Sequence, residues 1–373
     1  MFKFVDIFAG IGGIRLGFDS IGGDCVFSSE IDTHARETYQ SNFNEVPHGD
    51  IKKISAEEVP KHDLLLAGFP CPTFSIAGVS KLSSMGREHG LLDDTRGTLF
   101  FEICRILEYH NPRVFLLENV KGLLWNYTPL EKLGGLGPKK IEALMNHFKK
   151  SKQSKENNEK AMRKTIRYAS EKELCKVTGI GKFLAKRIHE SRTIVKMTRT
   201  LEELGYTVKS KVINSENFVP QRRERIFIVG FNNGTKFEFP ELPDDLPMLK
   251  NILEEQVDSK YTINDHLWAY HQDRKKKQKE KGNGFGFKIF NGNQSSGTLS
   301  ARYYKDGADL LIEQMGQNPR KLTPRECARL MGFPDDFKLN KSENQSYKQL
   351  GNAVVASLVS HLAKAIKEQA KWI

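Results

Sequence analysis

The stretch FVDIFAGIGG, residues 4–13, decides the fold expected for this chain. Its first half is a short apolar run of the kind found in buried parallel strands, and its second half is a glycine turn. Glycines after a strand permit a tight turn and a close approach of the backbone to a ligand. Gly17 follows the turn, and the glycine spacing departs from GxGxxG. The stretch predicts the first strand and a ligand-facing turn of an α/β sheet.

Further short apolar runs alternate with helical patterns. Leu99, Phe100, Ile103, Ile106 and Leu107 recur at helical spacing. Because strands alternate with helices, we predict a doubly wound α/β sheet. The pattern breaks after Trp125 and resumes near Thr198 with a helix and a strand, and the C-terminal stretch 351–370 is amphipathic. The predicted strands are CVFSSEI (25–31), DLLLAGF (63–69), VFLLENV (114–120) and RIFIVGF (225–231).

Two acids follow this first part of the pattern. Glu30 ends the second predicted strand, twenty residues after Gly10, and Asp50 stands near the presumed end of a third strand. A carboxylate at this spacing suits a ribose hydroxyl, which favours a nucleoside cofactor. The alternative is a generic strand-to-helix turn. No Walker lysine is present, so a nucleoside triphosphate is not expected.

Composition narrows the class of protein. The chain has 373 residues and 38% hydrophobic content, enough for more than one domain, and no apolar run reaches the length of a membrane span. The N-terminus turns glycine-rich too early for a secretory signal. Five scattered cysteines without a CxxC pair predict neither zinc nor a disulfide framework. We therefore expect a reduced, cytoplasmic protein without a metal.

The positive charge is concentrated in one segment. The chain holds 58 Lys and Arg against 46 Asp and Glu, and 19 and 7 of these lie between residues 131 and 200. The remainder holds 39 of each sign, so the segment carries the whole excess of +12. A solvated basic face is one interpretation, and an insert that binds a polyanion is the other.

A single cysteine lies between two prolines. The sequence GFPCPTFS, residues 68–75, places Cys71 between Pro70 and Pro72. Proline fixes φ and pushes the preceding residue toward extended geometry, so the thiol is expected in a stiff, non-helical loop. A buried structural cysteine needs no such flanks. The pattern indicates a presented nucleophile.

Together, DIFAGIGG, the Pro-Cys-Pro loop, ENV (118–120), QRRER (221–225) and GNAVV (351–355) resemble, in this order, the DNA cytosine-5 methyltransferase family. The resemblance covers residue 1 to about 125 and 198 to the C-terminus, and is nearest to the Dcm-type branch. It implies an S-adenosylmethionine-dependent, Rossmann-like catalytic domain, residues 1–129, 193–231 and 321–373. It also implies C5 methylation of a cytosine in a specific duplex sequence, here a CC-GG type site, in restriction-modification.

The resemblance also implies roles for individual residues. Cys71 is the nucleophile that adds to C6 of a flipped cytosine, Glu118 bonds N3 and the exocyclic amine, and Arg223 and Arg225 position the base and the phosphate backbone. This chain has Pro72 where the family has glutamine, which bears on loop closure. S-adenosylmethionine, with no metal, is expected at Phe8, Gly10, Gly12, Glu30, Asp50, Ile51, Pro70 and Asn352.

Residues 232–320 match the family's target-recognition region and are expected to form a small irregular domain. Arg302 and Tyr303 are candidates to contact DNA there, because arginine can read guanine edges. The lysine run in DRKKKQKEK (273–281) suits phosphate positioning or solubility.

Residues 130–192 have no place in the family pattern, and two pieces within them resemble the helix-hairpin-helix motif. The expected phosphate contacts are Gly135, Gly137, Lys139, Gly179, Gly181 and Lys182. The alternative is a basic helical spacer. Between the copies, the stretch KKSKQSKENNEK (149–160) is typical of a flexible linker.

The expected partner is double-stranded DNA, with no membrane, and the protein is expected to be a monomer associated with a prokaryotic nucleoid. Two rival functions are a tRNA cytosine-5 methyltransferase and a catalytically silent DNA-binding protein. The length of the recognition region argues against the first rival function. The second is disfavoured by four intact residues, Cys71, Glu118, Arg223 and Arg225.

Overall fold

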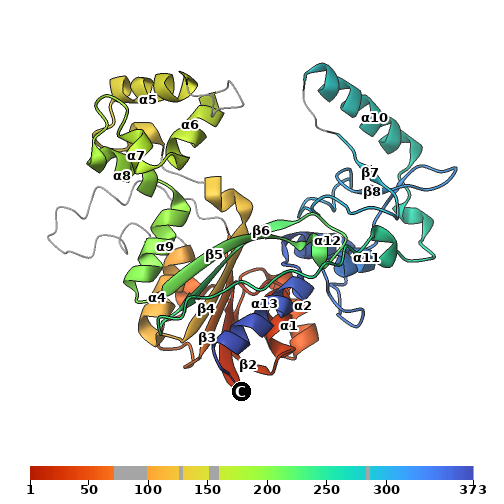
Figure 1. Cartoon of the computed structure of the whole chain (residues 1–373). Coiled ribbons are helices and arrows are strands. Elements are labelled where there is room, and N and C mark those ends of the chain that lie inside the picture. Colours follow the sequence, from red (N-terminus) through yellow and green to blue (C-terminus); the bar gives the residue numbers. More distant parts are fainter. Residues whose placement is uncertain (71–98, 126–128, 151–158, 283–285, 373) are drawn as a thin grey trace. The chain divides into compact units, whose positions relative to one another are not determined.

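The computed structural model describes residues 1–70, 99–125, 129–150, 159–282 and 286–372. It contains a six-stranded sheet with the order β2-β1-β3-β4-β6-β5 (Figure 1). Strands β2, β1, β3 and β4 are parallel to one another, which confirms the predicted α/β fold. The six strands are β1 (Phe2–Ile7), β2 (Gly23–Ser29), β3 (Leu64–Gly68), β4 (Val114–Val120), β5 (Thr207–Asn214) and β6 (Glu224–Phe231).

The strand order follows from the sequence pattern. The first four residues of β4 are fully buried, as expected for a parallel strand covered on both faces. From β1 the chain proceeds to β2 on one side, and β3 then pairs with β1 on the other. This reversal is a topological switch point, and in open α/β sheets ligands bind outside the carboxyl ends of the strands at such a point.

The C-terminal helix lies against the first helix. Helices α1 (Gly13–Asp19) and α13 (Ala356–Gln369) lie side by side (Figure 1), and a Cβ on Gly17 would come within 2.6 Å of Val359 Cγ1. This close approach of the two helices accounts for the glycine at position 17. The ring of Trp372 stacks on Phe2 at 4.2 Å, which fixes the C-terminal segment beside β1.

Residues 232–320 are more regular than predicted. They include α10 (Asp265–Glu280), a helix of 16 residues that the sequence analysis did not predict, and it contains the lysine run. Strands β7 (Ile289–Phe290), β8 (Leu311–Ile312) and β9 (Arg320–Lys321) form a small second sheet. Helices α2 (Thr33–Phe43), α11 (Pro324–Leu330) and α12 (Glu343–Asn352) lie outside this region of the sequence. Short 3-10 turns occur at η1 (Ile51–Lys53), η5 (Ser215–Asn217), η6 (Leu249–Asn251) and η7 (Ser259–Tyr261).

The chain forms two compact units. The first comprises Met1–Phe69, Tyr109–Glu118 and Lys209–Ile373, and the second comprises Pro70–Glu108 and Asn119–Val208. In the second unit, η3 (Lys121–Trp125) contacts α9 (Thr193–Glu203). Its other elements are α4 (Leu99–His110), most of which belongs to it, η4 (Leu130–Lys132), α5 (Pro138–Lys150), α6 (Glu159–Tyr168), α7 (Glu171–Leu174) and α8 (Lys182–Glu190).

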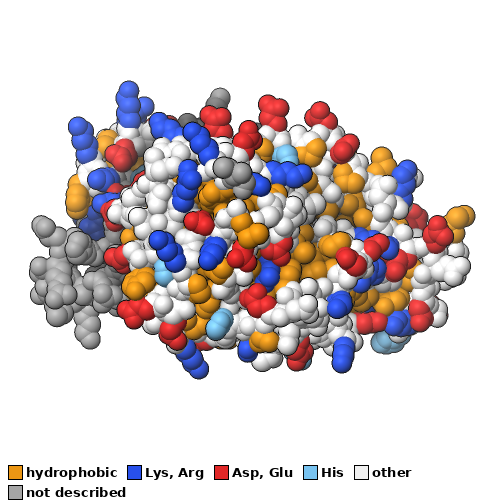
Figure 2. Space-filling view, turned by 90° about the horizontal axis from the view of Figure 1, so that it is seen from below, with side chains coloured by type: hydrophobic (Ala, Val, Ile, Leu, Met, Phe, Trp, Pro, Cys, Tyr) orange, Lys and Arg blue, Asp and Glu red, His pale blue; other side chains and the backbone are white. Residues whose placement is uncertain are grey.

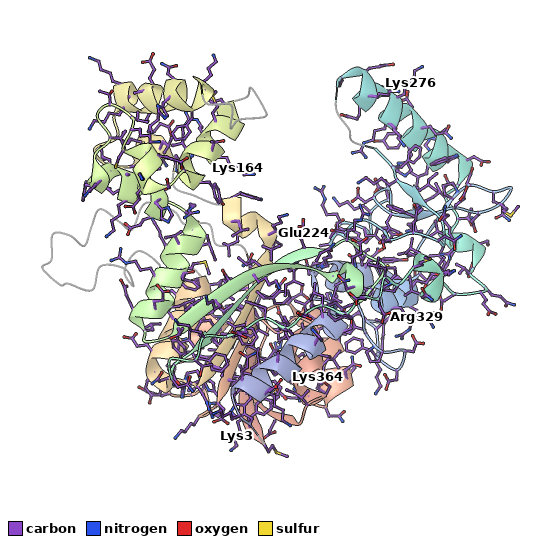
Figure 3. All side chains as sticks on the ribbon, viewed as in Figure 1. Lys3, Lys164, Glu224, Lys276, Arg329 and Lys364 are labelled. Atoms are coloured by element: carbon purple, nitrogen blue, oxygen red, sulfur yellow. The ribbon has the colours of Figure 1, made fainter. Side chains whose placement is uncertain are left out.

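Residues 130–188 have a hydrophobic core of their own, in which Leu144 and Ile188 are fully buried. Side chains of the segment contact Trp125 of η3. Lys164 of α6, labelled in Figure 3, lies 3.6 Å above the ring of Trp125, and Tyr168 packs edge-on against the same ring at 5.6 Å. The predicted linker falls mainly on residues 151–158, which lie outside the described part of the chain.

In the part of the chain that the structure describes, no helix is long and apolar enough to span a membrane. On the face shown in Figure 2, acidic and basic side chains are interspersed.

Candidate active site at the carboxyl edge of the sheet

The turn after β1 has an unusual backbone. Phe8 (φ 59°), Gly10 (φ 57°) and Gly12 (φ 86°) are all in the left-handed region, and Phe8 adopts it although it carries a side chain. Gly12 is further constrained, because a Cβ there would lie 2.2 Å from the ring of Phe43. Around Gly10, no described atom lies within 4 Å of the position of a Cβ. The turn therefore leaves open space beside Gly10, at the switch point of the sheet.

Glu30 closes this turn from the neighbouring strand. Its carboxylate accepts hydrogen bonds from the backbone N–H groups of Gly10 and Asp32, both at 2.8 Å. Asp32 caps α2 and also accepts a bond from Lys348 Nζ at 2.8 Å, and these bonds lower its pKa although its partial burial acts in the opposite direction. Ile31, between the two acids, is 70% exposed. The first acid is thus held rigidly by backbone amides beside the glycine turn.

Asp50 reaches the same edge by a different route from the one predicted. No strand ends directly before this residue. Instead, His48 alone bridges β2: its N–H donates to Ser28 O and its carbonyl accepts from Glu30 N, both at 2.8 Å. Asp50 then caps η1 through a bond from Lys52 N, and Ile51 is buried. A single bridge is enough to bring Asp50 beside the end of β2.

The C-terminal motif also reaches this edge. Asn352, the last residue of α12, is exposed, and a Cβ on Gly13 would lie 3.2 Å from Val354 Cγ2. Gly351 itself leaves no room for a side chain, because a Cβ would lie 2.4 Å from Ser300 O.

A buried ion pair lies at the ends of the next strands. Glu118 pairs in register with Gly68 and is 8% exposed, and its carboxylate lies 3.2 Å from Arg225 Nε. Burial raises the pKa of Glu118, and Arg225 and then Arg223 oppose this rise. Pro70, two residues after Gly68, is exposed. Cys71 and Pro72 follow directly in the chain but lie outside the described residues.

Arg223 differs from Arg225 in its surroundings. Its side chain is buried, and its guanidinium donates to Leu299 O at 2.9 Å, Gly351 O at 3.0 Å and Ala353 O at 2.7 Å. Burial lowers its pKa to about 9. The prediction that Arg223 contacts the base or the DNA backbone is therefore corrected: this arginine joins QRRER to GNAVV and to the segment around Leu299.

Gln221, which the sequence analysis did not single out, also joins the QRRER motif to distant segments. Its amide donates to Leu330 O at 3.0 Å and accepts from Leu299 N at 2.8 Å. The alternation of Gln221 and Arg223 in a strand-like segment is the signal that could have indicated inward-facing side chains.

Arg302 and Tyr303, the two residues predicted to contact DNA in the recognition region, differ in their exposure to solvent. Arg302 is exposed. Tyr303 is 1% exposed, and its hydroxyl donates to Leu310 O and accepts from Leu322 N. The prediction that Tyr303 contacts DNA is corrected, because its ring and hydroxyl are both used in the core.

All six residues predicted to contact phosphates in the insert, Gly135, Gly137, Lys139, Gly179, Gly181 and Lys182, are exposed. They lie at or shortly before the N-terminal turns of α5 and α8.

Within the described residues, no group of three or more His, Cys, Asp or Glu is placed to hold a metal. The edge described above carries a glycine turn, a rigid acid and a Glu–Arg pair at the ends of strands in an α/β sheet. Such an edge is typical of α/β enzymes that act on a substrate beside a nucleoside cofactor.

The comparison with known families specifies this class. The sequence profile described as "C-5 cytosine-specific DNA methylase" matches residues 2–133 and 181–368, and the chain belongs to that family. It is therefore a DNA cytosine-5 methyltransferase. The profile leaves residues 134–180 unmatched, and these fall within the predicted insert.

Several curated relatives support the assignment. The chain is 42% identical to the Type II methyltransferase M.DsaV of Dactylococcopsis salina, over 97% of this chain and 85% of the relative. It is 35% identical to the DNA-cytosine methyltransferase of Escherichia coli K12, over 99% of this chain and 78% of the relative.

Solved structures support the fold alone. The Dnmt2 methyltransferase of S. pombe aligns with a TM-score of 0.66 and 19% identity, over the full length of both chains. The methyltransferase EhMeth of Entamoeba histolytica aligns with a TM-score of 0.65 and 16% identity, over 99% of this chain and 98% of that chain.

The role of Arg223 in holding three segments together predicts a stability effect. Arg223→Lys should lower the free energy of unfolding by about 2–4 kcal/mol, because buried carbonyls lose their donors. Arg222→Lys is the matched control: this neighbouring side chain is 74% exposed, and its replacement should cost less than about 0.5 kcal/mol. Urea denaturation measures both. Equal stabilities for the two variants would contradict the structural role of Arg223.

Proposed function

We propose that this chain methylates C5 of a cytosine within a specific double-stranded DNA sequence, as the modification enzyme of a restriction-modification system. The names of its relatives, Type II methyltransferases, support the second part. The observation that carries the first part is the buried Glu118–Arg225 pair beside the strand end that leads into Pro70 and Cys71. A CC-GG type site is the recognition sequence proposed from the Dcm-type motifs.

The carboxyl edge suits S-adenosylmethionine. Glu30 is held by two backbone amides, which leaves carboxylate lone pairs for ribose hydroxyls, and the space beside Gly10 admits a close-lying ligand. Phe8, Gly12, Asp50, Ile51, Pro70 and Asn352 complete the proposed site. When bound, the cofactor supplies an electrophilic methyl group.

The proposed chemistry begins with Cys71. Its thiolate adds to C6 of the cytosine ring, and the electron pair of the C5–C6 bond makes C5 nucleophilic. After C5 has been methylated, loss of the C5 proton restores the double bond and breaks the C–S bond, so the thiolate is released. Because the reactive ring face is stacked in a duplex, the base must first leave the helix.

Glu118 and Arg225 are proposed to stabilise the ring during this reaction. The raised pKa of Glu118 favours a carboxyl group that can share a proton with N3, where negative charge develops. Arg225, with its Nε 3.2 Å from Glu118, supplies a fixed positive charge in a water-poor site. Arg223 is proposed as a positioning residue, because its donors are engaged by carbonyls.

The insert, residues 130–192, is proposed as a pair of helix-hairpin-helix modules that hold DNA phosphates without reading sequence. Support comes from left-handed Gly135 (φ 82°) and Gly179 (φ 83°), each shortly before a helix with an exposed lysine in its first turn. Residues 232–320, with exposed Arg302, are proposed to recognise the target.

Bisulfite sequencing of DNA from cells that express the chain tests the function directly. Cys71→Ser should abolish methylation and leave DNA binding intact. It should also prevent covalent trapping on DNA that contains 5-fluorocytosine, because the trap requires the C–S bond. Cys175→Ser, at an exposed cysteine, is the control and should behave like the parent. Trapping that survives in Cys71→Ser would exclude this residue as the nucleophile, and methylation of tRNA with unmodified DNA would exclude the proposed substrate.

The cofactor site predicts a weaker affinity in one variant. Glu30→Ala should weaken S-adenosylmethionine binding by roughly 1–3 kcal/mol, because polar partners are left unpaired. Glu37→Ala, an exposed carboxylate on α2, should leave the affinity unchanged. Isothermal calorimetry measures both, and an unaltered affinity in Glu30→Ala would refute the ribose contact.

The insert predicts a change in salt dependence. Replacing Lys139, Lys140, Lys182 and Lys186 with glutamine should lower DNA affinity and flatten its dependence on salt by roughly one unit for each phosphate that a lysine no longer neutralises. The cytosine that is methylated, and turnover at saturating DNA, should not change. Four exposed lysines elsewhere, Lys53, Lys61, Lys236 and Lys364, form the control set. An unchanged slope would favour a helical spacer.

A further inference from the structure

The two hairpins of the insert are structurally equivalent at an offset of 44 residues, the distance from Gly135 to Gly179. The φ angles of these glycines differ by one degree. In the first hairpin Leu136 N donates to Leu133 O at 3.0 Å, and in the second Ile180 N donates to Val177 O at 3.0 Å. The same alternation of buried and exposed positions follows each turn into α5 and α8. The insert is therefore an internal repeat in backbone as well as in sequence.

The two hairpins also pack reciprocally. A Cβ on Gly135 would lie 3.1 Å from Leu184, and a Cβ on Gly179 would lie 3.7 Å from Lys140. Positions 140 and 184 are themselves 44 residues apart. Each glycine turn is thus covered by the same helix position of the other hairpin, which is the mark of an approximate two-fold axis.

The repeat breaks at one exposed position. Lys139 and Phe183 occupy equivalent places in the first turn of α5 and of α8, and both are exposed. Phe183 is 71% exposed, although a side chain of this size is usually buried. Where one hairpin offers an ammonium group, the other offers an aromatic ring.

The surroundings of Phe183 are mainly cationic. Lys182 precedes it and is exposed, and the guanidinium carbon of Arg187 lies 5.6 Å from the centre of the ring. Lys186 lies one turn further along α8, and its neighbour Glu190 also pairs with Arg199. A surface of this charge, in the segment that carries the excess of +12, suits a polyanion better than a protein face.

We propose that Phe183 makes an apolar contact within a groove of double-stranded DNA, against a sugar or the edge of a base, while the equivalent Lys139 contacts a phosphate. The proposal rests on the proposed DNA-binding role of the insert and adds to it an asymmetry between the hairpins. Aromatic and apolar side chains contribute to DNA affinity without releasing counterions, whereas lysines at phosphates release them. The two positions therefore leave different signatures in a salt titration.

The test uses the full chain and a fluorescent duplex, with affinity measured over a range of KCl concentrations. Phe183→Ala should weaken binding about tenfold at every concentration and leave the salt slope unchanged, as expected when a base or sugar is deprived of its apolar neighbour. Phe183→Trp should retain the parent affinity. Lys139→Ala is the matched variant and should lower the slope by about one unit. Phe183→Lys, which restores the residue of the first hairpin, should raise the slope by about one unit.

The outcomes separate this proposal from the one on which it rests. If the four-lysine variant flattens the salt dependence but Phe183→Ala binds like the parent, the insert binds DNA and the role of the ring is wrong. If neither variant differs from the parent, the DNA-binding role of the insert fails. The alternative is that Phe183 contacts a second copy of this chain, and sedimentation velocity tests it. If the parent is a dimer, and Phe183→Ala is a monomer with unchanged DNA affinity, the ring serves self-association and the proposal is overturned.

Discussion

The guanidinium of Arg223 is the interaction on which the catalytic edge depends. Three backbone carbonyls from two distant segments converge on one buried cation. Ala353, one of these acceptors, directly precedes the residue that packs on Gly13, so the glycine turn after β1 is supported from the far end of the chain. Leu299 O, another acceptor, fixes the segment that returns from residues 232–298. A buried charge is tolerated here because oxygen atoms surround it.

The same motif separates two kinds of arginine within three residues. Arg223 donates to backbone carbonyls through Nη1 and Nη2 and sets positions, whereas Arg225 faces Glu118 and is half-buried. Arg222, beside them in the same motif, is turned toward solvent. Successive side chains of an extended segment point in opposite directions, which explains why Arg222 faces solvent while Arg223 and Arg225 do not. Arg223 and Arg225 differ in their partners, which are backbone carbonyls for the first and Glu118 for the second.

The sheet could be predicted from the sequence because parallel strands buried on both faces are short apolar runs, and VFLLENV coincides with β4. Helix α10 could not, since DHLWAYHQDRKKKQKE is polar on nearly all sides and lacks an apolar stripe. The places of Glu30 and Glu118 followed from the strands that lead to them, whereas the place of Asp50 did not, because only the single bridge of His48 connects it to β2. The burial of Arg223 and Tyr303 did not, because their partners are distant in sequence and both residue types are commonly exposed to solvent. Cys71 was identified from sequence alone and lies outside the described residues.

The insert begins after η3 and ends where α9 begins, and these two elements touch each other. Its entry and exit points are therefore close, as they are in a loop. Closing a short connection between neighbouring ends costs little chain entropy, so a version of this protein without residues 130–192 would keep the frame around η3 and α9. Because the segment has its own hydrophobic core, it has the features of an inserted domain that can be gained, lost or replaced in evolution without a change in the sheet.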